Sequence, residues 1–268
     1  MTSSPVSFQT LDTGIALLRL EQPKRRNALS LAAMQTLHAQ LDQALAERGL
    51  RVLIVTGAGA GFCAGLDLKS VLATDGGFEA SVQQAMALQH AFAGLVQRLR
   101  DTSVAVVAAV NGAAVGAGMA LALAADIRFA APQASFHVGA VKIGLTAGEC
   151  GISYHLPRLI GAGRAFEIML SGRPVGADEA ERIGLVAEVV EPDALLQRAL
   201  ACARQISANA PYATAHTKRV MWQNLDAGSL QAALELENHA QVLGLMTRDF
   251  QQAAQAFIEK RTPVFTGS

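Results

Sequence analysis

The stretch Val104–Ala125 reads VAVVAAVNGAAVGAGMALALAA and contains no charged residue. Its length would suit a membrane-spanning helix, but Asn111-Gly112 interrupts it and further glycines follow. The residues before Asn111 are rich in valine, which favours a strand, whereas the segment Met119–Ala125 favours a helix. The stretch therefore predicts a buried strand, a tight turn and a buried helix rather than a membrane span.

A second glycine-rich stretch, Gly57–Leu68 (GAGAGFCAGLDL), follows a predicted strand at Arg51–Thr56. A dinucleotide-binding GxGxxG turn would need a further glycine at Phe62 or Ala64, so that function is disfavoured. Taken alone, each glycine-rich stretch is also typical of a surface turn or of close packing between a strand and a helix. Two such stretches together predict an oxyanion hole, because free N–H groups where helices begin can stabilise a developing negative charge.

The remaining segments alternate between strands and helices up to about residue 195 and are then almost entirely helical. We expect a compact α/β core over residues 1–195 and a helical C-terminal region over residues 196–268. The elements expected in the core are strands at 6–11, 15–20, 127–131, 138–143 and 186–190, and helices behind Ser30, over 78–100 and over 162–170.

The composition argues against several classes of function. Lysine and arginine number 22, as do aspartate and glutamate, so a nucleic acid or an anionic membrane surface is not an expected partner. The three cysteines form no CxxC pair, which favours a reducing compartment, and Met1–Phe8 lacks the apolar core of a signal peptide. We therefore expect a cytoplasmic protein. No histidine pair has metal-ligand spacing, so no metal is expected.

Several motifs occur in a characteristic order: RNALS at 26–30, FCAGLDL at 62–68, NGAAVGAGMALALAADIRFA at 111–130, GLV at 184–186 and FIEKR at 257–261. As a set, they resemble the crotonase (enoyl-CoA hydratase/isomerase) superfamily over roughly residues 6–267. The resemblance implies an α/β fold, in which a spiral of ββα repeats is followed by a C-terminal helical trimerisation region. It also implies a homotrimer or a dimer of trimers.

The resemblance further implies a site for an acyl-coenzyme A thioester, in which coenzyme A is part of the substrate and no separate cofactor is needed. The oxyanion donors would be the backbone N–H groups of Leu66 and Ala117, the latter standing where many members have glycine. The residues that would contact coenzyme A or flank the thioester are Lys24, Arg26, Ala28, Leu29, Ala64, Gly65, Asp67 and Leu68. Phe257 and Lys260 would lie near the nucleotide, where they are often contributed across a trimer interface.

The acidic residues bear on which reaction is expected. By the resemblance, the two glutamates that place water in the usual enoyl-CoA hydratases fall at Ala120 and Ala140, and alanine cannot transfer a proton. Glu149 stands where dienoyl-CoA isomerases and the ring-opened-epoxide isomerases of phenylacetate breakdown carry a catalytic aspartate. A carboxylate there could move a proton between two carbons, and burial would raise its pKa toward that of a useful base. We expect double-bond isomerisation, with Glu149 as acid/base.

Other interpretations stay open. Glu149 could orient water in a hydratase, or act as a nucleophile as in the chlorobenzoyl-CoA dehalogenases. It could also be only a helix N-cap or first-turn acid. Separately, the absence of the two glutamates would allow a catalytically silent protein that binds coenzyme A or serves as a scaffold. The apolar segments 72–86 and 138–143 would suit an aliphatic or an aromatic acyl group. The residues near the loops that we interpret as structural are His137, His155, Cys63 and Cys150.

Overall fold

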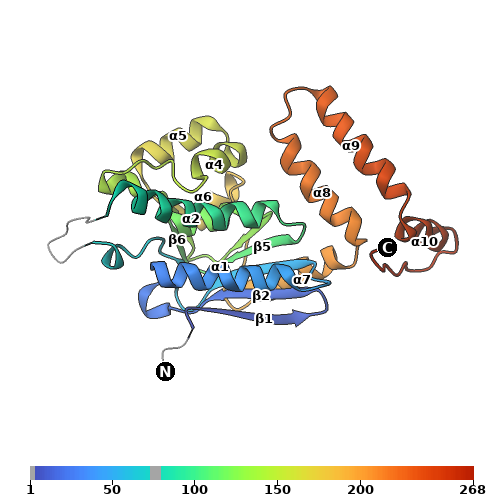
Figure 1. The fold of residues 1–268 in the computed structure, drawn as a ribbon, viewed down its shortest axis with the longest axis horizontal. Helices are drawn as coiled ribbons and strands as arrows, with labels where there is room; N and C mark the ends of the chain where they lie inside the picture. Colours follow the sequence, from blue (N-terminus) through green and yellow to red (C-terminus); the bar gives the residue numbers. More distant parts are fainter. Residues whose placement is uncertain (1–3, 73–79) are drawn as a thin grey trace.

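The computed structural model describes residues 4–72 and 80–268, which form two sheets flanked by helices (Figure 1). The larger sheet has the order β1-β2-β3-β5-β7-β10 and the smaller has the order β4-β6-β8-β9. The strands are β1 (Val6–Asp12), β2 (Ile15–Leu20), β3 (Val52–Gly57), β4 (Gly61–Cys63), β5 (Ala105–Val110), β6 (Ala113–Val115), β7 (Ile127–Ala130), β8 (Ser135–His137), β9 (Val175–Gly176) and β10 (Glu188–Val189).

The helices account for the rest of the regular structure. The α-helices are α1 (Leu31–Ala46), α2 (Val82–Asp101), α3 (Ala117–Ala124), α4 (Ile152–Ile160), α5 (Ala162–Ser171), α6 (Ala177–Arg182), α7 (Leu195–Ser207), α8 (Pro211–Asn224), α9 (Leu230–Leu245) and α10 (Arg248–Ile258). Three short 3-10 helices are η1 (Pro23–Arg25), η2 (Leu68–Ser70) and η3 (Ala140–Ile143).

From β3 to β8, consecutive strands alternate between the two sheets, and an α-helix follows each pair. β3 and β4 precede α2, β5 and β6 precede α3, and β7 and β8 precede α4. In the larger sheet β2, β3, β5, β7 and β10 pair in parallel, whereas β1 pairs with β2 in the antiparallel sense. The chain therefore forms the expected spiral of ββα repeats, and the parallel strands of each layer end at the same edge.

The central strand β3 is buried on both faces. Leu53 and Val55 belong to the core that includes α1, α2 and α3, whereas Val52 and Ile54 belong to a second core that includes α7. Because side chains alternate along a strand, a parallel strand covered on both faces must be apolar throughout. The same alternation holds in β5, which explains why the sequence before Asn111 is an uninterrupted apolar run.

Val104–Ala125 folds largely as predicted. It forms β5, a turn and α3, and the turn itself contains the short strand β6, which the sequence did not indicate. No helix in residues 4–72 or 80–268 is long and apolar enough to cross a membrane. The predicted helix over 78–100 begins outside the described residues at Phe78; α2 starts at Val82, after a capping box formed by Ser81 and Gln84.

The strand predicted at residues 138–143 is wrong. β8 ends at His137, and Gly139 then takes a positive φ of 38°, which turns the chain into the 3-10 helix η3. A left-handed residue breaks the extended backbone that a strand needs, so the apolar side chains of this segment sit on a turn. The predicted strand at 186–190 is reduced to β10, which has two residues.

The C-terminal helices divide into two groups. α7 packs on the larger sheet, whereas α8 and α9 form a hairpin that extends to one side of the sheets and is followed by α10 (Figure 1). The division of the chain at residue 195 stays a prediction.

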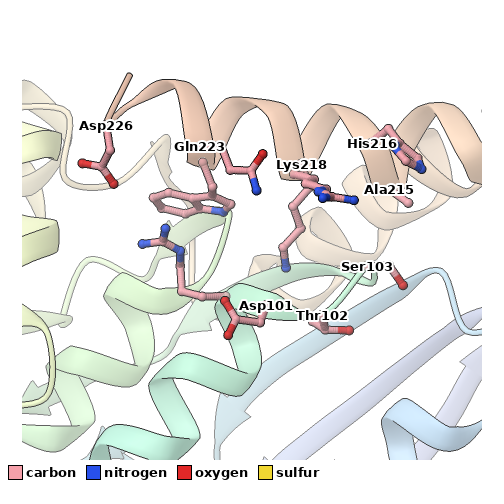
Figure 2. A pocket seen from close by; sticks show the side chains of 11 residues that line it. Asp101, Thr102, Ser103, Ala215, His216, Lys218, Gln223 and Asp226 are labelled. Atoms are coloured by element: carbon pink, nitrogen blue, oxygen red, sulfur yellow. The ribbon is translucent and has the colours of Figure 1, made fainter. Parts of the chain in front are cut away.

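α8 is anchored by Lys218, which points from the helix toward the segment after α2 (Figure 2). Its buried ammonium donates to the carbonyls of Leu99 and Val104, each at 2.8 Å, and pairs with Asp126 at 3.0 Å.

The Lys218 anchor makes a testable prediction about stability. Replacing Lys218 with Met leaves two buried carbonyls and the Asp126 carboxylate without their cation, so we expect the free energy of unfolding to fall by about 3 kcal/mol. Urea unfolding followed by the fluorescence of Trp222, the single tryptophan, measures this change. The exposed neighbour Arg219 is the control, since Arg219→Met should change stability by less than about 0.5 kcal/mol. An equal loss in the two variants would contradict the anchoring role.

Candidate active site

The first loop of the site is held against the segment that follows η1. Leu29 and Leu66 form a parallel bridge, in which the N–H of Leu29 donates to Gly65 at 2.7 Å and the N–H of Asp67 donates to Leu29 at 3.1 Å. The bridge leaves the N–H of Leu66 pointing away from Leu29, with no backbone acceptor among the described residues. The structure thus brings the predicted coenzyme A segment and the predicted thioester loop together.

Asn27 fixes this arrangement and was not predicted as a site residue. Its buried side-chain amide donates to the carbonyls of Ala58, Gly61 and Phe62 at 3.0, 2.8 and 3.2 Å. Its side-chain oxygen accepts from the N–H of Gln22 at 2.9 Å. A buried amide with every polar atom bonded is a positioning residue, and only its place within the RNALS motif could have indicated it.

The second loop ends at the first residue of α3. Ala117 follows Gly116, which caps the helix without a side-chain hydrogen bond, and the N–H groups of a first turn have no partner inside their helix. Gly65 brings the two loops together. A Cβ built at Gly65 would lie 2.5 Å from the carbonyl oxygen of Val115 and 3.3 Å from the nitrogen of Ala117. This contact places the N–H of Ala117 next to the peptide unit that carries the N–H of Leu66.

The carboxylate of Glu149 lies beside the same loop. Its Oε1 is 3.0 Å from the position that a Cβ at Gly116 would occupy. The side chain is half-buried, and desolvation raises its pKa above the ordinary value of 4.5. The alternative that Glu149 is a helix N-cap is wrong, because α4 begins at Ile152 with Gly151 as its N-cap and no side chain caps it.

The two positions at which the resemblance would place the hydratase glutamates are apolar and buried. Ala120 lies within α3 and is 0% exposed, and Ala140 begins η3 and is 7% exposed. Neither side chain can carry a proton. Of the acids near the loops, Asp67 is engaged elsewhere, since its carboxylate accepts from Arg25 at 2.9 Å. Arg25 was not predicted as a site residue, and nothing in the sequence marked this pair.

The other predicted residues fall into two groups. Lys24, Arg26 and Leu68 are exposed around the first loop, and Ala28 and Ala64 are half-buried there. By contrast, the structure does not bring Phe257 and Lys260 to the loops within one chain. Figure 1 shows α10 on the opposite side of the molecule from α4 and α5, and Phe257 is 85% exposed.

The nearby thiols and imidazoles have structural roles. Burial raises the pKa of Cys63 and of Cys150 to about 12, so neither thiol is a nucleophile at neutral pH. His137 makes a hydrogen bond of 2.8 Å to Ser135. His155 is buried in α4. Residues 4–72 and 80–268 contain no group of three or more His, Cys, Asp or Glu that could hold a metal ion.

An apolar cavity of about 670 Å³ opens beside the Glu149 loop. It lies between η3, α4 and α5, and Thr146–Gly148, Phe166 and Met169 are among its lining residues. The sequence predicted an apolar acyl pocket formed by the segments 72–86 and 138–143. Residues 73–79 of the first segment lie outside the described residues. A second cavity, of about 570 Å³, lies between α8 and the end of α2 and contains none of the predicted site residues (Figure 2).

Comparison with known proteins identifies the family. The sequence profile of the enoyl-CoA hydratase/isomerase family matches residues 10–268. The chain belongs to this family. A probable enoyl-CoA hydratase of Mycobacterium leprae is 42% identical over 260 residues, covering 93% of this chain and 86% of the relative. The 1,2-epoxyphenylacetyl-CoA isomerase of Escherichia coli is 34% identical, covering 96% of this chain and 97% of the relative.

A solved structure confirms the fold. The crystal structure of a probable enoyl-CoA hydratase/isomerase from Mycobacterium abscessus superposes with a TM-score of 0.90 at 38% identity, and covers 99% of this chain and 100% of its own. The chain is therefore an acyl-CoA enzyme of the enoyl-CoA hydratase/isomerase family with the crotonase fold. The names of its relatives include both a hydratase and an isomerase, so the reaction has to be argued from the site.

Contact between the two loops predicts the effect of a single methyl group. In Gly65→Ala the new Cβ has to push the Val115 carbonyl away, which separates the two N–H groups. We expect turnover of an enoyl-CoA thioester to fall about 100-fold. Gly49 is the matched control, because it is also left-handed (φ 89°) but an added Cβ meets nothing within 4 Å. Comparable losses of kcat in Gly65→Ala and Gly49→Ala would mean that backbone strain, rather than loop contact, is responsible.

Proposed function

We propose that this protein shifts a carbon–carbon double bond within an acyl-coenzyme A thioester. Leu66 and Ala117 donate their backbone N–H groups to the thioester oxygen, and Glu149 transfers the proton. Coenzyme A is part of the substrate, and the reaction requires no separate cofactor. The observation that carries the proposal is the half-buried carboxylate of Glu149 beside Gly116, one residue from the proposed donor Ala117.

The proposed steps balance without a second reactant. The Glu149 carboxylate takes a proton from one carbon of the acyl chain, and the electron pair moves through the double bond onto the thioester oxygen. The two N–H groups stabilise this enolate, each by roughly 3 kcal/mol. The protonated Glu149 then returns the proton to a different carbon, and the double bond ends in its new position. Substrate and product have the same mass.

The raised pKa of Glu149 suits the role of a general base. A general base is most useful when its pKa lies near the working pH, and desolvation raises the pKa of Glu149 in that direction. Hydration by the two-glutamate route would need acids where Ala120 and Ala140 stand. The Escherichia coli relative is also named an isomerase, although the substrate in its name is an epoxide and not an alkene.

Hydration is the second candidate, because the Mycobacterium leprae relative is named a probable hydratase. In that case Glu149 orients the attacking water, and the product gains the mass of one water. Nucleophilic attack by Glu149 would instead leave a covalent acyl-enzyme. A catalytically silent scaffold would bind acyl-CoA without turnover. Each alternative can therefore be distinguished from isomerisation, either by its product or by the lack of any product.

The proposal extends to the assembly and the coenzyme A contacts. We propose a homotrimer or a dimer of trimers, in which Phe257 and Lys260 of one protomer contact the nucleotide bound by another. The exposed apolar side chains on α10 and at the C-terminal end of α9 support this, notably Met246 (71% exposed), Phe257 (85%) and Ile258 (74%). Lys24, Arg26, Ala28 and Leu29 line the nucleotide side of the first loop in this proposal. A cytoplasmic location stays a prediction.

Glu149→Gln tests the proposed reaction. The amide keeps the shape of the carboxyl group but cannot carry the proton, so we expect kcat for interconversion of 2-enoyl-CoA and 3-enoyl-CoA to fall about 1,000-fold. The products are identified by mass and absorbance.

The pH dependence of the wild type gives a second test of Glu149. Its kcat/KM should fall as the pH is lowered through the pKa of Glu149, with a midpoint above 4.5, because only the carboxylate accepts a proton.

Each other outcome of that assay has a definite meaning. A product heavier by one water establishes hydration and removes the isomerase proposal. Full activity in Glu149→Gln removes Glu149 from the mechanism. Binding of acyl-CoA with no turnover in either protein favours the scaffold.

Lys260→Ala tests the nucleotide contact across protomers. Losing one charge-assisted hydrogen bond to a phosphate should raise KM for an enoyl-CoA about tenfold and leave kcat nearly unchanged. The matched control is the substrate itself, since a pantetheine thioester that lacks the nucleotide should show the same KM in the two proteins. Light scattering gives the number of protomers. An unchanged KM for enoyl-CoA, or a monomer with wild-type affinity, would contradict this contact.

A further inference from the structure

His155 is a buried titratable residue that the proposed mechanism does not use. It lies in the first turn of α4 and is 3% exposed. Its two ring edges contact different parts of the molecule. One faces Arg100 at the end of α2, and the other faces Gly151, two residues after Glu149.

The contact with Arg100 fixes the protonation state of the ring. Nη1 of Arg100 lies 3.3 Å from Nδ1 of His155. A guanidinium has no lone pair to accept a hydrogen bond, so Nδ1 is the acceptor and carries no proton. Burial, together with the positive charges of Arg100 (α2), Arg128 (β7) and Arg158 (α4), lowers the pKa of His155 to about 4. The imidazole is therefore neutral across the ordinary working range of pH.

Arg100 is itself held by the C-terminal region. Its guanidinium stacks 3.8 Å above the ring of Trp222 on α8, and the ring of His155 meets the same indole edge-on at 5.7 Å. The indole N–H donates to Asp126 at 2.7 Å, and Asp126 also pairs with Lys218. The position of His155 therefore depends on α8 being docked against the core.

On its other side, His155 supports the turn that carries Glu149. Cys150 and Gly151 have positive φ values of 47° and 82°, an unusual backbone path for a cysteine. The N–H of Ile152 closes the turn by donating to the carbonyl of Glu149 at 2.8 Å. Cδ2 and Nε2 of His155 lie 3.4 and 3.6 Å from the place of a Cβ at Gly151. A Cβ at Gly151 would thus be in ordinary van der Waals contact with the ring, so the ring bounds the space beside this residue.

We propose that His155 is a positioning residue, whose neutral ring, fixed by Arg100 and Trp222, holds the Glu149 turn against the oxyanion loops. This inference rests on the proposed function, because it assigns a purpose to the placement of Glu149. It links the docking of α8 to the catalytic acid through the contacts Trp222–Arg100–His155–Gly151. His155 itself touches no reacting atom.

Two substitutions separate positioning from packing. His155→Leu replaces the ring with an apolar side chain of similar size, so the acceptor for Arg100 is lost. His155→Asn places its Oδ1 where Nδ1 of the histidine stands, so an acceptor remains. We expect His155→Leu to lower kcat about 30-fold with KM little changed, and His155→Asn to recover most of the loss. Ile160→Ala is the control, since it creates a cavity at the far end of α4 and should lower stability without lowering kcat.

A second readout does not depend on activity. A titration of ¹³C-labelled glutamate side chains by NMR, with the Glu149 signal assigned from Glu149→Gln, gives the pKa of this carboxyl group directly. We expect the pKa to fall toward its ordinary value in His155→Leu, because a loosened turn admits water to Glu149, and to stay raised in His155→Asn and Ile160→Ala. The fluorescence of Trp222 reports whether α8 remains docked in each variant.

The outcomes separate this inference from the proposed function. An unchanged pKa of Glu149 in His155→Leu overturns the positioning role, whatever the activity. A pKa that falls equally in Ile160→Ala also overturns it, since general loosening would then suffice. If Glu149→Gln retains full activity, the proposed function fails, yet a selective fall of the pKa in His155→Leu would still establish that His155 positions Glu149.

Discussion

At Gly65, Gly112 and Gly118 the backbone of one turn touches the backbone of its neighbour, and no space remains for a Cβ between them. These contacts join the start of β4 to the turn before β6, and the end of β4 to the end of β6 and the first turn of α3. The N–H groups of Leu66 and Ala117 are thereby set by the fold and not by side-chain torsions. Donors fixed in advance need no reorganisation when charge develops on a bound oxygen, which is the condition for strong stabilisation of an anion.

In the proposed reaction, the same arrangement gives a half-buried acid beside these two N–H groups a use. Burial raises the pKa of Glu149 relative to the unfolded chain, so the charged form is disfavoured in the folded state. This cost appears as the pH rises through the unfolded pKa, and it is complete once the pH exceeds the folded pKa. In the proposed reaction Glu149 is protonated whenever the enolate exists. The site then holds one negative charge instead of two, and that charge lies on the oxygen facing the N–H groups.

The sequence predicted those features that are local. The valines before Asn111 and the glycines after it indicated β5, the turn and α3, since periodicity and breakers determine such elements. The strand expected at 138–143 failed because one left-handed glycine, Gly139, outweighs the strand propensity of the valine and isoleucine around it. Glu149 could be placed only by resemblance. Its distance from Gly116 depends on two elements separated by more than thirty residues in the chain.

The roles of Asn27 and Arg100 could not be predicted from the sequence, because each depends on what surrounds a side chain. Asn27 becomes a positioning residue only because three carbonyls converge on its amide. Arg100 lies at the end of an amphipathic helix, where a solvated charge is the ordinary expectation. Its stacking on Trp222 requires α8, which is more than a hundred residues away, to return to the core.

The geometry of the C-terminal region restricts how it can serve a coenzyme A site. Lys218 and Trp222 tie α8 to Asp126 of the core, so the hairpin of α8 and α9 is fixed where it leaves the sheets. α10 then lies across the molecule from the loops of its own chain (Figure 1). If Phe257 and Lys260 contact a nucleotide, that nucleotide has to belong to another protomer. The assembly and the nucleotide contact are therefore one proposal, because a monomer cannot provide the contact.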